Sequence, residues 1–302
     1  MPAATRVIKR RIRSVGNTRK ITKAMEMVAA TKMRRAVSKV LETRSYSTRA
    51  WDMVRDLAQK TDPKYHPLLQ RKKKVKRVAA VVMASNRGLC GGFNREVVEQ
   101  CISYTKGIKD KNQKIEIDVI LMGKKAAELS TRHGYNVIAE FPKADVATGI
   151  QDISAVAKMV VNDFINNKYD LVTLIYTDFY SALRQTPRAR QLLPIEQQDD
   201  ELGAVKATEE KEQKQEEHEY LFEPSPDAVL EQMLHRLIEV QIYQALLESN
   251  ASEHSARMMS MRNASDAAKD MIEDLTLTFN RARQASITAE IADIAGGKAA
   301  VE

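Results

Sequence analysis

The sequence predicts a layered α/β domain flanked by two long helices that pair as an antiparallel coiled coil. Only 5% of the 302 residues are aromatic, and the chain has 11 Gly and 8 Pro, a composition that disfavours an all-β fold and suits long helices. Between residues 75 and 195, short apolar runs alternate with helical patterns, as in an α/β domain with a mainly parallel sheet. Long stretches on both sides of this region lack proline. Together these observations predict a rod formed by the two terminal helices and a globular foot formed by the central domain.

The first helix is predicted from Thr5 to Lys60, because this stretch has no proline and only one glycine. Apolar residues recur three or four positions apart along it, as in Ile8, Ile12 and Val15. The dipeptide Asp62-Pro63 then stops the pattern. At 1.5 Å per residue, such a helix is ~80 Å long, far longer than a typical helix of a globular domain.

The central region is predicted to alternate strands and helices along the chain. The strands are expected at 75–84, 115–122, 136–141 and 170–177, the helices at 94–109, 124–133 and 150–167, and a further extended segment at 181–195.

The second long helix is predicted to start after Pro226, since no further proline follows and the next glycines are Gly296 and Gly297. It would be on the order of 100 Å long. A seam along its distal half has a mean spacing of 3.5 residues, which is the coiled-coil period. The seam consists of Met261, Ala264, Ala268, Met271, Leu275, Phe279, Ala282, Ser286 and Ala289.

The predicted organisation has six parts. They are an N-terminal coiled-coil helix (1–62), a basic linker (63–74), the α/β domain (75–195), an acidic loop (196–224), a C-terminal coiled-coil helix (225–295) and a tail (296–302).

Charge is distributed unevenly along the chain. Residues 1–60 contain 16 Lys or Arg against 4 Asp or Glu, and RKKKVKR (71–77) adds six bases in seven positions, whereas residues 196–219 contain ten acids and three bases. This asymmetry indicates an acidic partner for the basic end, and nucleic acid, anionic lipid and an acidic protein surface all fit. The basic start could also be a transit peptide, but its helical pattern continues through residue 60, so we interpret it as mature sequence. No apolar run is long enough to cross a bilayer.

The glycine-rich stretch MASNRGLCGGFN (83–94) lies at a predicted strand-to-helix turn. Its Gly88, Gly91 and Gly92 match neither the dinucleotide-binding fingerprint nor the phosphate-binding loop with its Lys-Ser/Thr pair, so we predict a structural turn. The five histidines show no metal-ligand spacing, and Cys90 and Cys101 match no metal or redox motif. We therefore predict no catalytic residue, no metal and no cofactor.

The ends of the two long helices carry residues typical of a contact surface. Polar side chains are concentrated at 281–288, and KITKAMEMVAATKMRR (20–35) mixes methionines with bases on several helix faces. A helix that is adaptable or apolar all round is usually enclosed by a partner. The alternative from pattern alone is a solvated two-stranded coil with a charged outer face.

Three motifs together resemble the gamma subunit of the F-type rotary ATP synthase: KITKAMEMVAATKM (20–33), SNRGLCGGFN (85–94) and RQASIT (283–288). The resemblance covers essentially the whole chain and is weakest over 196–219. It implies a non-catalytic central shaft, driven by proton flow, that turns inside the ring of alpha and beta subunits. It also implies an epsilon subunit and a ring of c subunits as partners, no nucleic acid, and a peripheral place at the cytoplasmic face of a bacterial plasma membrane.

The same resemblance implies roles for particular residues. Those expected to contact the beta subunits are Arg283, Gln284, Thr288, Arg257, Met25, Lys20, Lys23 and Arg35. Those expected to contact the c ring are Tyr220, Leu221 and Glu223. Some family members carry a regulatory cysteine pair, which this chain lacks.

Two other functions remain open from the residues. A nucleotide-binding enzyme would use the α/β domain and would bind ATP, ADP or NAD tightly. A basic coiled-coil protein could instead bind nucleic acid, although residues 1–60 offer only Tyr46 and Trp51 for stacking on bases.

Overall fold

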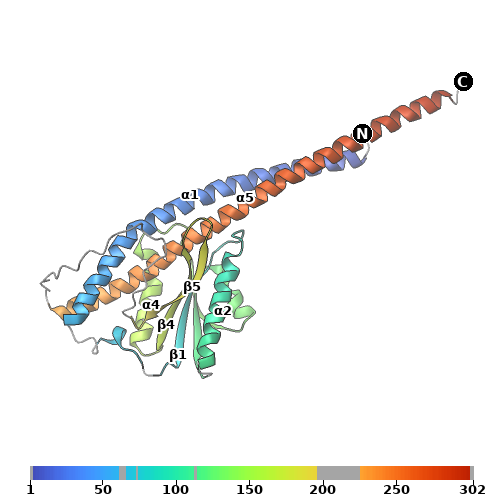
Figure 1. Cartoon of the computed structure of the whole chain (residues 1–302). Coiled ribbons are helices and arrows are strands. Elements are labelled where there is room, and N and C mark those ends of the chain that lie inside the picture. The colour runs from blue at the N-terminus through green and yellow to red at the C-terminus, as the bar shows by residue number, and fades with distance from the viewer. Residues whose placement is uncertain (1–2, 61–65, 73, 112–113, 196–224, 300–302) are drawn as a thin grey trace. The chain divides into compact units, whose positions relative to one another are not determined.

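The computed structural model describes residues 3–60, 66–72, 74–111, 114–195 and 225–299. The chain divides into two compact units, and both long helices pass from one unit into the other (Figure 1). Unit 1 comprises residues 1–29 and 257–302, and unit 2 comprises residues 30–256. The helices are α1, Ala3–Lys60, and α5, Pro226–Ala299. The predicted fold class, an α/β domain with two long terminal helices, is confirmed.

Unit 2 is built on a five-stranded sheet of order β3-β2-β1-β4-β5. The strands β1 (Arg77–Met83), β2 (Glu116–Met122), β3 (Asn136–Phe141) and β4 (Leu171–Phe179) are parallel, and β5 (Gln185–Leu193) pairs antiparallel with β4. All but the first residue of β1 are buried, because helices cover both faces of this central strand. The predicted continuous apolar run at 75–84 is therefore a central parallel strand.

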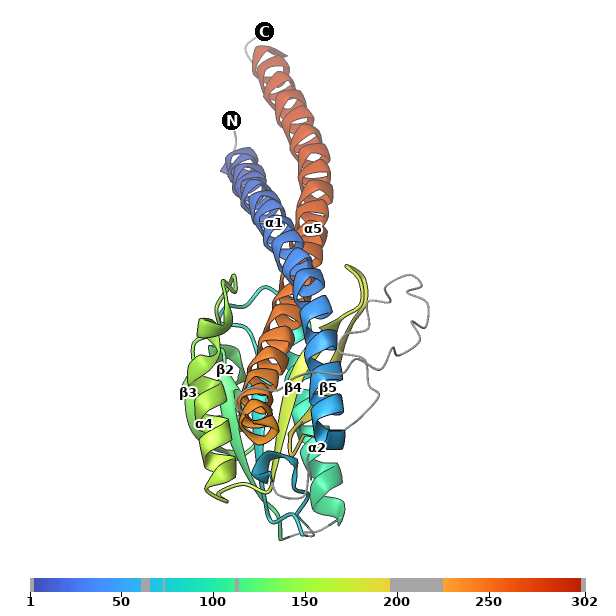
Figure 2. The same cartoon turned by 90° about the vertical axis from the view of Figure 1, so that its left-hand side faces the viewer.

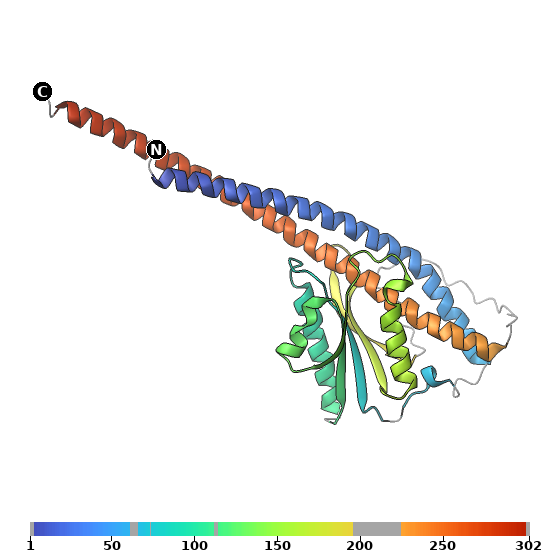
Figure 3. The ribbon, with the colours of Figure 1, turned by 180° about the vertical axis from the view of Figure 1, so that it is seen from behind.

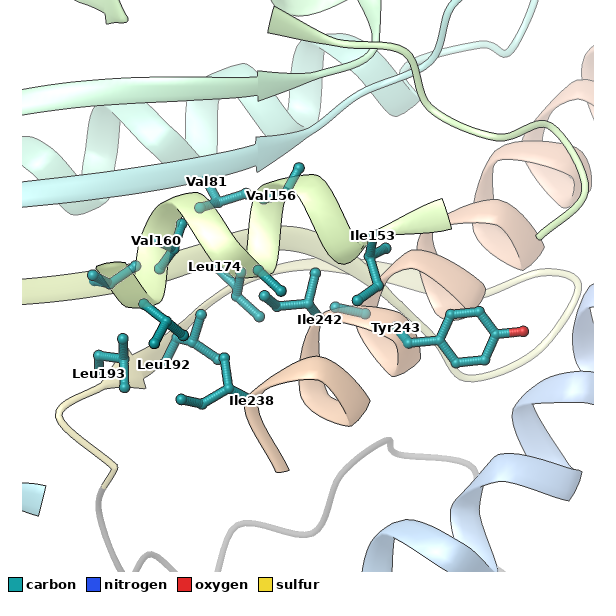
Figure 4. Close-up of a cluster of buried hydrophobic side chains, with 14 of the residues drawn as sticks. Val81, Ile153, Val156, Val160, Leu174, Leu192, Leu193, Ile238, Ile242 and Tyr243 are labelled. Carbon is teal, nitrogen blue, oxygen red and sulfur yellow. The ribbon is translucent and has the colours of Figure 1, made fainter. Parts of the chain in front are cut away.

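The two faces of the sheet are covered by different helices, as Figure 3 shows. Helix α2 (Phe93–Lys111) packs on one face, where Val97, Val98 and Cys101 join the side chains of Ala80 and Val82. Helix α4 (Ser154–Ile165) and the unit 2 part of α5 pack on the other face. There the larger of the two cores forms, with residues from α4, the sheet and α5 interleaved (Figure 4). Figure 4 labels Val81, Ile153, Val156, Val160, Leu174, Leu192, Leu193, Ile238, Ile242 and Tyr243.

The predicted helix at 124–133 is only partly correct. The structure has a 3-10 turn at Lys124–Ala126 and a four-residue helix α3 at Glu128–Thr131. Glycines with left-handed backbone bound the segment, Gly123 at φ 100° and Gly134 at φ 68°, and the Tyr135 N–H donates to the Leu129 carbonyl oxygen at 3.1 Å. These turns leave too few residues for a longer helix.

Unit 1 consists of the first part of α1 and the last part of α5. The two segments run antiparallel, with the N- and C-terminal ends of the chain at the same end of the unit (Figure 2). On α5, Met261, Ser265 and Ala268 are buried, and so is Thr5 on α1. Burial of these side chains indicates that the two helices pack together.

The predicted seam on α5 is correct in its period and wrong at two positions. Met271 is 45% exposed, whereas Ser265 is 5% exposed and Ile272 is half-buried. Ala289 is also exposed. The buried and half-buried row has alternating steps of four and three residues, as a coiled coil requires: 261, 265, 268, 272, 275, 279, 282 and 286. The prediction placed the apolar Ala264 where the structure has the polar, buried Ser265, and placed Met271 one position before the half-buried Ile272.

Candidate partner-binding site

The motif at the end of α5 is presented to solvent. Arg283, Gln284 and Thr288 are all exposed, and the Thr288 hydroxyl donates to the Gln284 carbonyl oxygen at 3.0 Å. That bond turns the hydroxyl inward along the helix and leaves the carboxamide of Gln284 and the guanidinium of Arg283 on the surface. A cation and an amide on adjacent positions of a rigid helix can bind carboxylate and carbonyl oxygens of a partner.

Three of the predicted contact residues of α1, Lys20, Lys23 and Met25, lie in the same unit. Lys20 is exposed, and Lys23 forms an ion pair with Glu26 at 3.0 Å. Met25 is half-buried, as is Arg257 on α5. Arg35 is exposed and belongs to unit 2. The predicted contacts with the c ring, Tyr220, Leu221 and Glu223, lie outside the described residues.

Both helices of unit 1 carry large apolar side chains that are exposed. On α1 these include Val7, Ile21, Met27 and Val28, between 56% and 62% exposed, and on α5 they are Met271, Leu277, Ile287 and Ile291, between 45% and 61% exposed. Single exposed apolar side chains are common on protein surfaces, so these groups support a contact surface only in combination with the positive charge of the same helices. We therefore take the outer faces of these helices as the candidate site, and name them the unit 1 surface.

The unit 1 surface is also strongly basic along α1. Residues 3–29 contain eight Lys or Arg and a single acid, Glu26, which is paired with Lys23. Positive charge of this density favours an acidic partner and steers its approach. The combination of apolar and basic groups fits a protein surface with acidic loops better than a nucleic acid, because no aromatic residue lies between 3 and 29.

The glycine-rich loop after β1 is closed by its own side chains. Asn94, in the first turn of α2, accepts the Ser85 N–H at 2.9 Å and donates to the Cys90 sulfur at 3.2 Å. Within the loop, Gly91 has φ 58°, a left-handed conformation that favours glycine, and Leu89 shares it at φ 63°. Of the predicted turn residues Gly88, Gly91 and Gly92, Gly91 alone has this left-handed backbone, and the structural role of all three stays a prediction. Asn94 is the residue that sequence reasoning missed here.

Helix α5 contacts the end of the sheet where α/β folds of this kind bind nucleotides. Such folds bind ligands at the carboxyl ends of the strands, where the order of connections reverses; here that point lies between β1 and β4. The Ser252 hydroxyl of α5 donates to the Thr177 carbonyl oxygen near the end of β4, at 3.2 Å. On the same helix, Ala251 packs against Phe179, the last residue of β4. This arrangement argues against the nucleotide-binding enzyme.

The basic run at 71–77 has a structural role in part. The Asp170 carboxylate accepts hydrogen bonds from Lys72 Nζ at 2.9 Å and from the backbone N–H groups of Lys76 and Arg77 at 2.8 and 3.0 Å. Burial alone would raise the pKa of the Asp170 carboxyl, but these hydrogen bonds and the charge of Lys72 bring the pKa below its ordinary value. The run thus anchors the start of β1 to the start of β4.

Other chemistry finds little support in the described parts of the chain. No three His, Cys, Asp or Glu side chains there come together as metal ligands would. Burial raises the pKa of the Cys101 thiol to about 12, so this thiol is inert at neutral pH. Among the described helices, none is both long and apolar enough to span a bilayer.

Comparison with known proteins agrees with this geometry. A family model described as ATP synthase matches residues 4–301. The ATP synthase gamma chain of Herpetosiphon aurantiacus is 42% identical over 306 residues, covering 99% of both chains, and that of Heliobacterium modesticaldum is 43% identical over 298 residues, covering 98% of both.

Solved structures share the fold at lower identity. The rotor of the Euglena gracilis mitochondrial ATP synthase contains a chain that is 20% identical, with a TM-score of 0.62, covering 94% of this chain and 99% of its own. The central stalk of the Tetrahymena thermophila enzyme matches with 23% identity and a TM-score of 0.56, covering 81% of this chain and 99% of its own. The full-length match to the family model and to relatives above 40% identity shows that the chain belongs to the ATP synthase gamma-chain family.

Proposed function

We propose that this chain is the central rotor shaft of a proton-translocating ATP synthase and acts on the catalytic beta subunits through the unit 1 surface. As a member of the gamma-chain family it is a non-catalytic subunit of that complex. The observation that carries the proposal is the combination of exposed apolar side chains with a dense positive charge on the two helices of unit 1. A surface of this kind suits a shaft enclosed by other subunits.

The two helices of the shaft act on the beta subunits through different kinds of contact. The basic residues of α1, including Lys20 and Lys23, attract acidic loops of the beta subunits without requiring one rigid register, because electrostatic attraction acts at a distance. Arg283 and Gln284 make directional contacts at the end of α5, with Thr288 in the same motif. As the shaft turns, each beta subunit meets a different face, and its nucleotide affinity changes by as much as the differential contact energy allows.

The remaining partners complete the proposal. Met25, Arg35 and Arg257 contact the beta subunits, while Tyr220, Leu221 and Glu223, which lie outside the described residues, contact the ring of c subunits. An epsilon subunit binds unit 2. Through the c ring the chain is held peripherally at the cytoplasmic face of a bacterial plasma membrane, and it needs no cofactor of its own.

Reversing the charge of Arg283 tests the proposal. Arg283→Glu is expected to leave assembly intact, because the side chain is exposed, and to lower ATP synthesis by about tenfold, as loss of a charge contact at a desolvated interface does. The control is Lys106→Glu, the same charge change at an exposed position of α2 in unit 2, away from the unit 1 surface, which should synthesise ATP near the wild-type rate.

Normal synthesis by the Arg283 variant would count directly against the contact assigned to it. The shaft role itself is tested separately with purified chain, which should hydrolyse no ATP alone but should be needed for cooperative turnover by alpha and beta subunits. Steady ATP hydrolysis by the chain alone would overturn the non-catalytic role.

A further inference from the structure

One stretch of α5 is enclosed on every side although most of its side chains are polar. All fifteen residues from 241 to 255 are buried. Nine of them are polar or charged: Gln241, Gln244, Glu248, Ser249, Asn250, Ser252, Glu253, His254 and Ser255. Polar groups tolerate such burial only when they are hydrogen-bonded. The stretch therefore implies specific partners around the helix.

The loop at 142–148 supplies the partners on one side. Lys143 Nζ lies 2.8 Å from Glu253 Oε2 and 3.0 Å from Ser249 Oγ, and the charged side chains are 2% and 3% exposed. Asn250 Nδ2 donates to the Ala144 carbonyl oxygen at 3.0 Å, and His254 Nε2 donates to that of Asp145 at 2.9 Å. Positions 249, 250, 253 and 254 form one stripe of the helix, since each residue advances by 100°.

The end of β4 and the turn into β5 supply the partners on the opposite side. The Ser252 hydroxyl donates to the Thr177 carbonyl oxygen at 3.2 Å, and the Ser255 hydroxyl donates to that of Ala182 at 2.7 Å. Gln185 Nε2 donates in turn to Ser255 Oγ at 3.4 Å. Positions 252 and 255 lie on the far side of the helix from the first stripe. We name the loop 142–148 and the segment 177–185 together the clamp.

The same loop also holds the other long helix. Lys32 of α1 forms an ion pair with Asp145 at 2.9 Å, and Lys39 Nζ donates to the Thr148 carbonyl oxygen at 3.2 Å. Burial alone would raise the pKa of Asp145, but the hydrogen bond and charge of Lys32 bring that pKa below its ordinary value, so the carboxylate of Asp145 stays ionised near neutral pH. Unit 2 begins at residue 30 and ends at residue 256, so the clamp holds each helix within a few residues of that boundary.

We propose that the clamp, centred on the buried Lys143–Glu253 pair, is a rotational lock that carries torque between the α/β domain and the long helices. Apolar contacts are non-directional, so by themselves they fix the rotational position of a helix less sharply than hydrogen bonds do. Hydrogen bonds to fixed backbone carbonyl groups are directional, and turning α5 would break those on both sides and leave buried polar groups unpaired. Lys143 is thus a positioning residue for coupling. The inference rests on the proposed shaft function.

The test removes the hydrogen bonds and the ion pair of the clamp and keeps side chains of similar volume in their place. The variant Lys143→Met/Ser249→Ala/Glu253→Met exchanges the buried pair for apolar side chains of similar volume, a change that proteins generally tolerate. The matched control is Arg236→Gln/Glu239→Gln, which removes a partly exposed ion pair of 3.1 Å elsewhere on α5. Each is built into the complete ATP synthase in vesicles, where ATP hydrolysis, ATP-driven proton pumping and thermal stability are measured.

We expect the lock variant to hydrolyse ATP and melt like wild type while its ratio of protons pumped to ATP hydrolysed falls about twofold or more, because α5 turns against its support under load. The control should keep the wild-type ratio. A wild-type ratio in the lock variant, with or without a loss of stability, overturns the inference and leaves the pair a structural role alone.

A milder variant keeps the test decisive if the first does not assemble. Ser252→Ala/Ser255→Ala removes only two hydroxyl donors on the other side of the clamp and favours the helix. It should lower the same ratio, and an unchanged ratio contradicts the lock. If the wild-type complex pumps equally well without this chain, the shaft function fails, and with it the basis of the inference.

Discussion

Two stretches of the same helix show opposite relations between polarity and burial. Residues 241–255 of α5, in unit 2, are all buried and nine of them are polar. Farther along, in unit 1, Met271, Leu277, Ile287 and Ile291 are large, apolar and exposed. The first stretch is enclosed by its own chain, whereas the second leaves large apolar groups exposed, which we propose other subunits cover. Side-chain polarity alone therefore does not predict burial along this helix.

The largest effect should follow from truncating a leucine in each stretch. Leu246 is fully buried in the larger core of unit 2, and Leu277 is 58% exposed in unit 1. Leu246→Ala should lower the free energy of unfolding by about 2–5 kcal/mol through lost burial and the cavity that remains. Leu277→Ala should change it by less than about 0.5 kcal/mol. Urea denaturation of the purified chain measures both, and equal losses would break the comparison.

Replacing a buried acid should lower the free energy of unfolding in a pH-dependent way, and by more than replacing an exposed acid. Asp170→Asn should cost about 1–3 kcal/mol near neutral pH, because the amide cannot replace a carboxylate that accepts from Lys72 and two backbone N–H groups. The folded pKa of Asp170 lies below its ordinary value of 3.8, so its ionised form stabilises the fold above that pH, and the contribution disappears as the pH falls through the folded pKa.

The difference between Asp170→Asn and wild type should therefore shrink below about pH 4. The control is Glu273→Gln, at an exposed ion pair of unit 1 with Lys269 at 3.9 Å, which should cost less than about 0.5 kcal/mol. Denaturation curves recorded across the acid range give both results. A loss at Asp170 that is independent of pH would show that the carboxylate charge is not what stabilises the strand ends.

The smallest expected effect is a gain. Gly16 lies in α1 within unit 1, and a methyl group added there would meet no atom within 4 Å. Gly16→Ala should stabilise the helix by roughly 0.5–1 kcal/mol, because glycine loses more backbone freedom on folding. Gly107→Ala in α2 of unit 2, equally open, should give a similar gain and serves as the control. A loss at position 16 alone, measured by thermal unfolding, would reveal a contact that the helix pair makes there.

Much of the fold could be predicted from periodicity. The strand expected at 136–141 has those bounds in the structure, and the bounds expected for β1, β2 and β4 differ from the observed ones by two residues or fewer. Continuous apolar runs such as 77–83 and proline-free helical stretches are strong signals, because they reflect local geometry. The antiparallel direction of β5 could not be predicted from the sequence, because pairing direction depends on contacts between residues that are far apart in the chain.

The contacts of α5 could not be predicted in the same way. Lys143 and Glu253 are 110 positions apart, and nothing in either neighbourhood identifies the other as its partner. Ser265 belongs to the buried seam because of its place in the 4-3 spacing, although its side chain is polar. The assigned contacts at Arg283 and Gln284 rest on resemblance to a family, and the structure adds that both side chains are exposed.

The way α5 completes the larger core has a consequence for biosynthesis. Leu174 and Leu192 of the sheet share that core with Leu234 and Leu246, which follow them by more than 40 residues in the chain. During translation the sheet is therefore finished while part of one face still awaits its covering helix. Exposed apolar surface on a partly synthesised domain is prone to aggregation. The nascent chain passes through its most vulnerable stage between the completion of β5 and the emergence of residues 230–247 from the ribosome.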